Sequence, residues 1–162
     1  LIHGGGHERG MRAGTEDVAG AVGLARAAEL AVANREEFAA RVSTLRDRLE
    51  AGLRERVPDL VVNAAGAERA PHICNVSVPG VANETLLLTL DMEGIAVSSG
   101  SACSSGAVKP SHVLLALGLP EEIAAPSVRF SLGSSTTGAE IEQVLRVFPP
   151  LMERLRSMAA VI

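Results

Sequence analysis

Residues 127–132 read SVRFSL, and hydrophobic and polar side chains alternate at every position. This period of two is typical of a β-strand that lays one face against a core. The hydrophobic face holds Val128, Phe130 and Leu132. Arg129 lies on the other face between two serines, where its planar guanidinium is suited to bind a carboxylate. The alternative interpretation is a solvent-exposed arginine on an edge strand.

A second stretch, residues 72–78 (HICNVSV), alternates in the same way and predicts another strand. Its more apolar face carries Cys74, which we expect to be a buried core thiol because free cysteines are among the most buried residues. Shorter strands are predicted at residues 60–63 and 95–98.

Helical patterns precede and separate these strands. Residues 16–57 show apolar steps of three and four, which predict one long helix or two abutting helices with a break at Asn34. Shorter helices are predicted at residues 84–93 and 112–117. Together the elements predict an α/β fold of the α+β kind, a small sheet with helices over one face and a long linking helix before it.

Helix ends have recognisable signals. We expect Thr15 and Asn83 to cap the first two helices, since both residue types accept hydrogen bonds from free backbone N–H groups. Thr137 and Glu140 have the spacing of a capping box that opens the last helix. The pair at 149–150, Pro-Pro, is expected to kink or break that helix.

The chain has 162 residues, 47% of them hydrophobic, which is enough for a folded domain. A net charge of −4 and only 2% aromatic residues argue against a nucleic-acid partner. No apolar run reaches the roughly 18 residues that cross a membrane, so no membrane partner is expected. The two cysteines and scattered histidines predict no metal site in this chain alone and favour a reducing, cytoplasmic setting.

Residues 97–111 (VSSGSACSSGAVKPS) surround Cys103 with Ser, Gly and Ala. Such residues favour an accessible loop over a strand or helix. A thiol reacts as a thiolate, and it needs a nearby cation or base to lower its pKa. The nearest cation in the sequence is Lys109, and no Cys-His-Asn order typical of a cysteine protease is evident. The stretch is typical of a thiol that carries a group between two places, and an ordinary loop cysteine is the alternative.

Residues 4–15 (GGGHERGMRAGT) are rich in glycine and lead into the first predicted helix. A glycine-rich loop before a helix can hold a phosphate, although this one matches neither common phosphate-loop motif. Two interpretations of this stretch therefore stay open: a structural turn, or an anion site that includes Thr15. The sequence begins without Met at an apolar pair that resembles a strand end, and we expect it to be part of a longer protein.

Four segments resemble, in the same order, the carboxy-terminal half of cysteine desulfurases of the IscS/NifS type. They are residues 4–15, 75–106 (NVSVPGVANETLLLTLDMEGIAVSSGSACSSG), 110–118 (PSHVLLALG) and 127–133 (SVRFSLG). The most specific element is SSGSACSSG around Cys103. That family is class V aminotransferase-like and belongs to the fold type I enzymes that use pyridoxal phosphate (PLP).

The resemblance implies a set of roles. The thiolate of Cys103 would take the sulfur of L-cysteine, leaving L-alanine and a persulfide, and pass it to an iron–sulfur scaffold protein or to tRNA thiolation. Any metal contact of Cys103 would come through a cluster shared with such a scaffold. Arg129 would bind the substrate carboxylate. Thr15 would contact the PLP phosphate of the neighbouring subunit in a homodimer.

The resemblance also implies a domain boundary and a missing part. Residues 1–33 would belong to the end of the large PLP domain, and residues 34–162 would form the small domain with the Cys103 loop. The family's PLP lysine lies upstream of the matched segments, and Lys109 is the single lysine here. We therefore expect the chain alone to lack PLP and activity. A non-catalytic sulfur-relay or scaffold-binding module and a selenocysteine lyase are the alternative functions.

Overall fold

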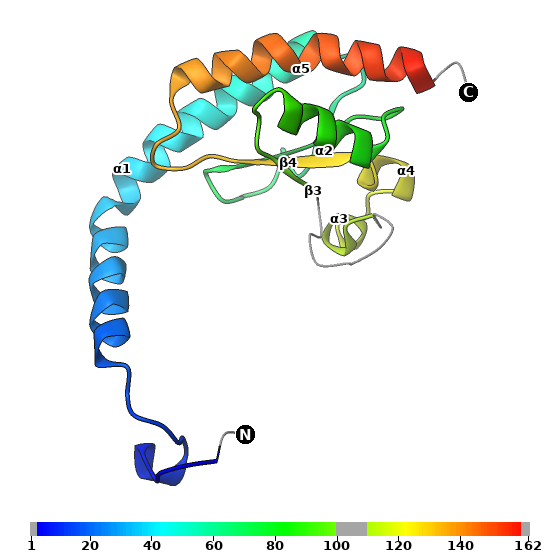
Figure 1. Cartoon of the computed structure of the whole chain (residues 1–162). Coiled ribbons are helices and arrows are strands. Elements are labelled where there is room, and N and C mark those ends of the chain that lie inside the picture. The colour runs from blue at the N-terminus through cyan, green and yellow to red at the C-terminus, as the bar shows by residue number, and fades with distance from the viewer. Residues whose placement is uncertain (1–2, 100–109, 160–162) are drawn as a thin grey trace. The chain divides into compact units, whose positions relative to one another are not determined.

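The computed structural model describes residues 3–99 and 110–159 (Figure 1). By their contacts the residues divide into two units, Leu1–Glu37 and Phe38–Ile162. The elements follow the order η1 (Glu8–Gly10), α1 (Val18–Arg56), β1 (Val61–Val62), β2 (Ile73–Ser77), α2 (Asn83–Met92), β3 (Ser98–Ser99), α3 (His112–Ala116), α4 (Glu121–Ala124), β4 (Ser127–Ser131) and α5 (Gly138–Ala159). The predicted mixed α/β fold with a small sheet and a long preceding helix is confirmed.

The sheet of the second unit has four strands in the order β1-β2-β4-β3, and all neighbouring pairs are antiparallel. The two alternating stretches of the sequence form the two central strands, β2 and β4. Arg129 therefore lies on an interior strand, so its interpretation as an edge-strand residue is wrong. Interior strands form because both of their edges find hydrogen-bond partners, which alternation alone does not reveal.

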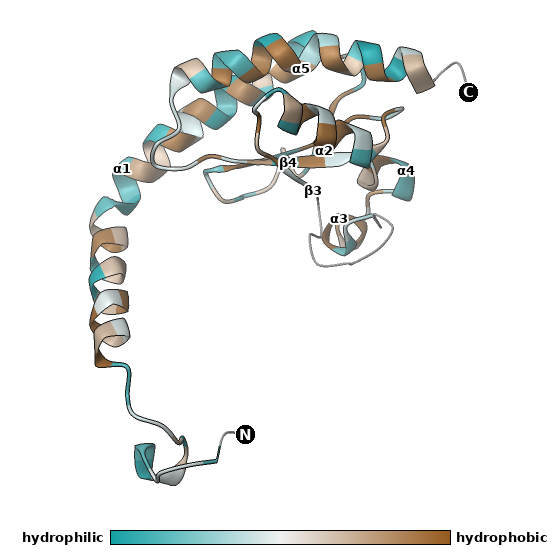
Figure 2. Ribbon diagram, viewed as in Figure 1, coloured by the Kyte–Doolittle hydropathy of each residue, from teal (hydrophilic) through white to brown (hydrophobic). Residues whose placement is uncertain are grey.

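The core lies on one face of this sheet. Cys74, Val76 and Val128 are fully buried there, which confirms the prediction of a buried thiol at position 74. Leu86 and Leu90 of α2 join the same cluster. The second half of α1 and all of α5 complete the cover, and Figure 2 shows the banded hydropathy of α5 that places one of its sides against the core. The short helix α3 lies by the opposite face of the sheet, where its residues line a pocket together with Arg129.

Two helix caps differ from their predictions. Asp17 caps α1: its Oδ1 accepts the N–H of Gly20 at 2.9 Å, and its carbonyl accepts the N–H of Ala21. Thr15 lies too far before the helix to do so. Asn83 already belongs to α2, whose cap is Ala82, and its side chain donates instead to the carbonyl of Ala125.

The last helix begins as predicted and continues further than predicted. Thr137 and Glu140 form the expected reciprocal capping box. The helix does not break at Pro149-Pro150, because α5 runs without interruption to Ala159. Three buried residues follow the prolines and hold this part of α5 on the core: Leu151, Met152 and Leu155.

The first unit contains the glycine-rich stretch and the start of α1, which runs through Asn34 without the predicted break. Its described residues include none that is buried. Large hydrophobic side chains are exposed along this part of the helix: Val18, Val22, Leu24, Leu30 and Val32. Figure 2 colours it largely brown and pale. A helix with apolar residues on all sides is normally surrounded by other protein.

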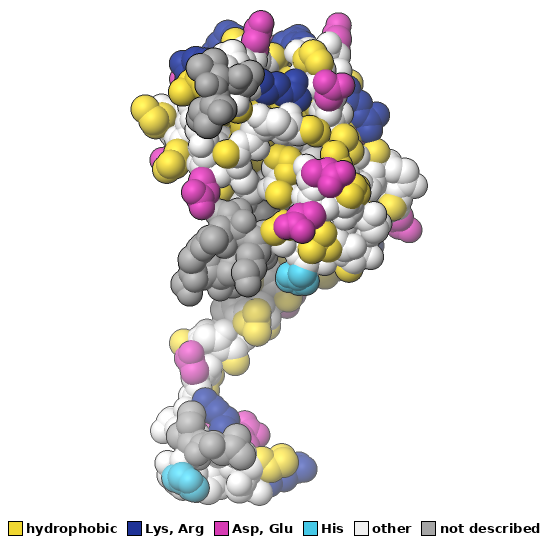
Figure 3. All heavy atoms as spheres, turned by 90° about the vertical axis from the view of Figure 1, so that its right-hand side faces the viewer, with side chains coloured by type: hydrophobic (Ala, Val, Ile, Leu, Met, Phe, Trp, Pro, Cys, Tyr) yellow, Lys and Arg dark blue, Asp and Glu magenta, His cyan; other side chains and the backbone are white. Residues whose placement is uncertain are grey.

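The surface of the second unit is mixed. On the face shown in Figure 3, Asp and Glu side chains are scattered among hydrophobic ones, and arginines gather toward the top, where α5 lies. Within the described ranges, no helix is both long and apolar enough to cross a membrane.

Candidate functional site

Four polar residues form one row across the sheet. Strand pairing places Asn75 directly opposite Arg129, and Ser98 opposite Arg129 on its other side. The N–H of Asn63, just after β1, donates to the carbonyl of Asn75 at 2.9 Å and continues the row. Paired residues in antiparallel strands project from the same face. Because the residues beside them in sequence point into the core, the row lies on the opposite face of the sheet.

A pocket of about 220 Å³ opens over this row. Its polar residues include Asn63, Asn75 and Arg129. Its apolar wall comes largely from α3 and the residue after it, with Val113, Leu114 and Leu117. Arg129 is exposed, and among the described residues no hydrogen bond or ion pair engages its guanidinium. The pocket thus combines a free cation with an apolar wall, a suitable arrangement for a small organic anion.

Arg69 also lines this pocket, but its charge is already matched. Its two terminal nitrogens bind the two oxygens of Glu50 at 2.6 and 2.7 Å. This forked contact raises the pKa of Arg69 above its usual value, and Glu50 itself is buried. Such a bidentate pair neutralises both partners. Arg129 is therefore the better anion ligand of the two arginines.

Cys74 lies on the core face, near the same buried pair. Burial raises the pKa of its thiol to about 12, and the negative charge of Glu50 adds to this effect. At neutral pH the group is a thiol and not a nucleophilic thiolate. Its full burial also keeps Cys74 away from any partner at the surface, as expected of a core thiol.

The predicted site residues are not all gathered in this pocket. Thr15 lies exposed in the first unit, in the stretch where Glu8 and Arg9 have positive φ angles. His7 and Glu16 on either side of it approach within 3.2 Å. Cys103 and Lys109 lie outside the described residues. The structure describes a local setting for Arg129, and the roles of all three site residues remain predictions.

Asn63 and Asn75 were not singled out from the sequence. Asn75 has one available signal, because it directly follows Cys74 on the expected strand and lies on the more polar face of the alternating stretch. Asn63 has no such signal, since its place beside Asn75 depends on the pairing of β1 with β2.

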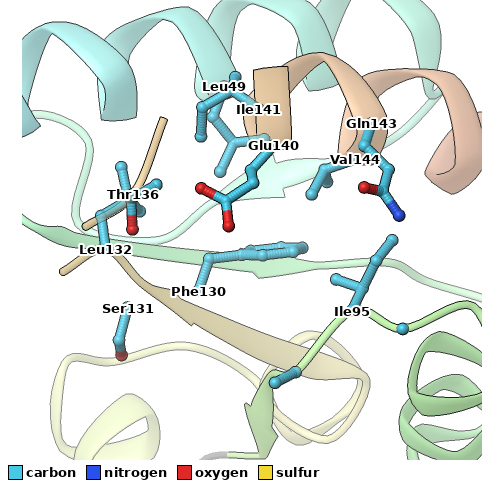
Figure 4. A pocket seen from close by; sticks show the side chains of 12 residues that line it. Leu49, Ile95, Phe130, Ser131, Leu132, Thr136, Glu140, Ile141, Gln143 and Val144 are labelled. Carbon is cyan, nitrogen blue, oxygen red and sulfur yellow. The ribbon is translucent and has the colours of Figure 1, made fainter. Parts of the chain in front are cut away.

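A second pocket, of about 320 Å³, lies beside the core between β4 and α5. Figure 4 shows Glu140 and Val144 of α5 near the ring of Phe130. The carboxylate of Glu140 is engaged by the N–H and hydroxyl of Thr137, and these hydrogen bonds lower its pKa. The acid is used for helix capping, so this pocket offers no free catalytic group comparable to Arg129.

Comparison with known proteins decides the family. The model of the class-V aminotransferases matches residues 4–144. The chain belongs to this family. Class-V aminotransferases are PLP-dependent. The expected resemblance to cysteine desulfurases is confirmed, because the chain's relatives carry that name.

Several of the chain's relatives are named cysteine desulfurase. The chain is 49% identical over 161 residues to cysteine desulfurase IscS of Clostridium botulinum, and 46% identical over 159 residues to a cysteine desulfurase of Trichormus azollae. Each match covers 98% of this chain, but 41% and 40% of the relative. A crystal structure of a NifS-like protein from Rickettsia africae aligns with a TM-score of 0.80 at 30% identity, covering 94% of this chain and 39% of that one. The chain thus spans about two fifths of the length of its curated relatives.

The described residues do not build a complete PLP site. A Schiff base needs a lysine, and residues 3–99 and 110–159 contain none. The exposed hydroxyl of Thr15 could donate one hydrogen bond to a phosphate, which is one contact of such a site. The described residues therefore do not by themselves hold PLP in place for catalysis.

Proposed function

We propose that this class-V chain is the sulfur-accepting part of a cysteine desulfurase, which converts L-cysteine to L-alanine. The observation that carries the proposal is the free guanidinium of Arg129 in a pocket on the outer face of the sheet, in a chain 49% identical to a cysteine desulfurase. Arg129 binds the carboxylate of L-cysteine through its planar fork. The interior position of β4 supports this role, because both neighbouring strands hold the arginine's backbone in place.

Cys103 takes the sulfur in this proposal. Its thiolate attacks the sulfur of L-cysteine, so that an S–S bond forms and the C–S bond breaks. The electron pair of the broken bond stays on carbon, which gains a proton and leaves as L-alanine. The products are alanine and a persulfide on Cys103, and atoms and charge balance. The complete burial of Cys74 supports the assignment, since the other thiol of the chain has no surface from which to pass on a sulfur, and burial also raises its pKa.

The cofactor lies for the most part outside this chain. When bound in the full enzyme, PLP would supply an electron sink for the loss of the substrate's α-proton. We propose that Thr15 contacts the PLP phosphate of a neighbouring subunit in a homodimer. The exposed apolar residues on the first part of α1 support a need for further protein around this unit. By itself the chain is expected to be inactive.

The persulfide is passed to a partner. We propose an iron–sulfur scaffold or another sulfur acceptor, such as the tRNA thiolation machinery, and a reducing cytoplasmic setting that keeps Cys103 a thiol. The two-cysteine content of the chain is consistent with that setting.

The test is a sulfide and alanine assay after co-expression of this chain with a PLP-binding portion of a class-V desulfurase. Wild-type assemblies should form one alanine per sulfur released. Cys103→Ser should abolish persulfide formation, and Arg129→Ala should raise the KM for L-cysteine. Cys74→Ser is the matched thiol control and should leave turnover unchanged. Persulfide formation on Cys103→Ser would contradict the nucleophile assignment.

A further inference from the structure

We propose that Asn75 is a second ligand for the substrate carboxylate, and that Asn63 holds its side-chain amide in the orientation that donates. The inference rests on the proposed function, because it concerns the same anion that Arg129 binds. It adds two residues to the site that the sequence did not indicate.

The backbone places Asn75 and Arg129 next to each other. They are directly opposed on β2 and β4, and both line the 220 Å³ pocket. Directly opposed residues in antiparallel strands have Cβ atoms about 4.5–5.5 Å apart. One carboxylate with two oxygens can span side chains at that separation.

Asn63 determines which end of the Asn75 amide is free. The Nδ2 of Asn63 donates to Oδ1 of Asn75 at 2.6 Å and to the hydroxyl oxygen of Ser77 at 2.8 Å. Both N–H bonds of Asn63 are thus used, in a side chain that is only 3% exposed. The oxygen of Asn75 is occupied on the β1 side of β2, so its NH₂ group turns away from Asn63. Arg129 lies on that other side, beyond β2 on β4.

The charges of the pocket favour an anion as the ligand. A free Asn75 NH₂ group and the Arg129 guanidinium are both donors, and neither has a hydrogen-bond acceptor among the described residues. The remaining arginine of the pocket, Arg69, is matched by Glu50. A carboxylate would satisfy both free donors at once, as a hydrogen bond to an ionised group is stronger than one between neutral groups.

Steady-state kinetics of the assembled desulfurase provide the main test. Asn75→Ala should raise the KM for L-cysteine about tenfold with little change in kcat, because it removes one hydrogen bond to a charged group. Asn75→Asp keeps the acceptor for Asn63 but places a carboxylate beside Arg129, and should raise KM further. Ser131→Ala, on the same face of β4 but outside the pocket, is the control and should match the wild type.

A binding measurement on the full 162-residue chain separates this role from folding defects. In ¹⁵N NMR spectra, L-alanine should shift the side-chain signals of Asn75 and Arg129, whereas L-alaninamide, which has no carboxylate, should not. Asn63→Ala should weaken the L-alanine effect at Asn75 while the backbone signals keep their dispersion.

The possible results distinguish the two proposals. An unchanged KM in both Asn75 variants, or no shift at the Asn75 amide, overturns the inference. If Arg129→Ala still raises KM in that case, the proposed function stands without Asn75. If neither Arg129→Ala nor the Asn75 variants change KM, the carboxylate site itself is wrongly placed.

Discussion

The guanidinium of Arg56 donates a hydrogen bond of 3.1 Å to the carbonyl oxygen of Leu145. In an uninterrupted α-helix this carbonyl accepts the backbone N–H four residues later, at position 149. Pro149 has no N–H, so Arg56 of α1 replaces the missing donor of α5. The continuity of α5 through two prolines therefore depends in part on a residue from another helix.

Replacing Arg56 by alanine should lower the free energy of unfolding by about 1–3 kcal/mol, because the carbonyl of the buried Leu145 loses its donor. Urea unfolding followed by circular dichroism measures the change. In a Pro149→Ala background the helix supplies its own N–H, so Arg56→Ala should cost less. Arg54→Ala, an exposed neighbour, is the control. An equal loss in both backgrounds would contradict this explanation.

Gly52 allows α1 to approach α5. A Cβ at this position would lie 2.6 and 2.7 Å from the two methyl carbons of the buried Leu145. Gly52→Ala should therefore destabilise the chain by about 1–3 kcal/mol through overpacking. Gly23→Ala is the matched control in the same helix, with nothing within 4 Å, and should be neutral or slightly stabilising. Thermal unfolding compares the two, and equal melting temperatures would argue against close packing at Gly52.

The ion pair of the buried Glu50 with the half-buried Arg69 gives a third expectation. Arg69→Met should destabilise the protein by about 1–3 kcal/mol, because the buried Glu50 loses both short hydrogen bonds and keeps only the 4.0 Å contact with Arg46. Replacing both residues by leucine should recover most of this loss, which chemical unfolding can measure. The exposed pair of Arg26 and Glu29 is the control, and Arg26→Ala should change stability by less than about 0.5 kcal/mol. No measurable effect of Arg69→Met would contradict this expectation and would mean that Arg46 or water replaces the lost contacts of Glu50.

We expect the raised pKa of the Cys74 thiol to lower the stability of the chain in alkaline solution. Burial raises the pKa of its thiol from 9.0 to about 12, so the unfolded chain releases this proton at a lower pH than the folded one. The contribution of the buried, protonated thiol to the free energy of unfolding is complete below pH 9.0. It is lost as the pH rises toward about 12. The slope should approach roughly 1.4 kcal/mol for each pH unit.

Unfolding of the wild type and Cys74→Ala at a series of alkaline pH values measures this contribution. The difference between the two chains should shrink as the pH rises, because the alanine variant lacks the titrating group. Iodoacetamide labelling of the native chain at neutral pH should leave Cys74 unmodified. Rapid native labelling of Cys74 would show that the thiol is more accessible than its buried position implies.

Local sequence patterns were sufficient for most elements. The alternation in residues 72–78 and 127–132 predicted β2 and β4, because a strand with one buried face must repeat every two residues. The capping box of Thr137 and Glu140 was equally readable, since its hydrogen bonds join residues three positions apart. The cap of α1 was misplaced because Thr15 and Asp17 are both good caps, and local propensity does not choose between them.

The sequence by itself determined the residue types available to the site and the face on which Arg129 lies. Only the tertiary structure decided that Arg129 is on an interior strand, that Asn75 opposes it, and that Asn63 binds the oxygen of Asn75. These relationships depend on which strands pair and in which register. Pairing is set by how the whole hydrophobic surface is buried, so no single segment encodes it. The continuity of α5 at Pro149 has the same origin, because its missing donor comes from Arg56, far away in the chain.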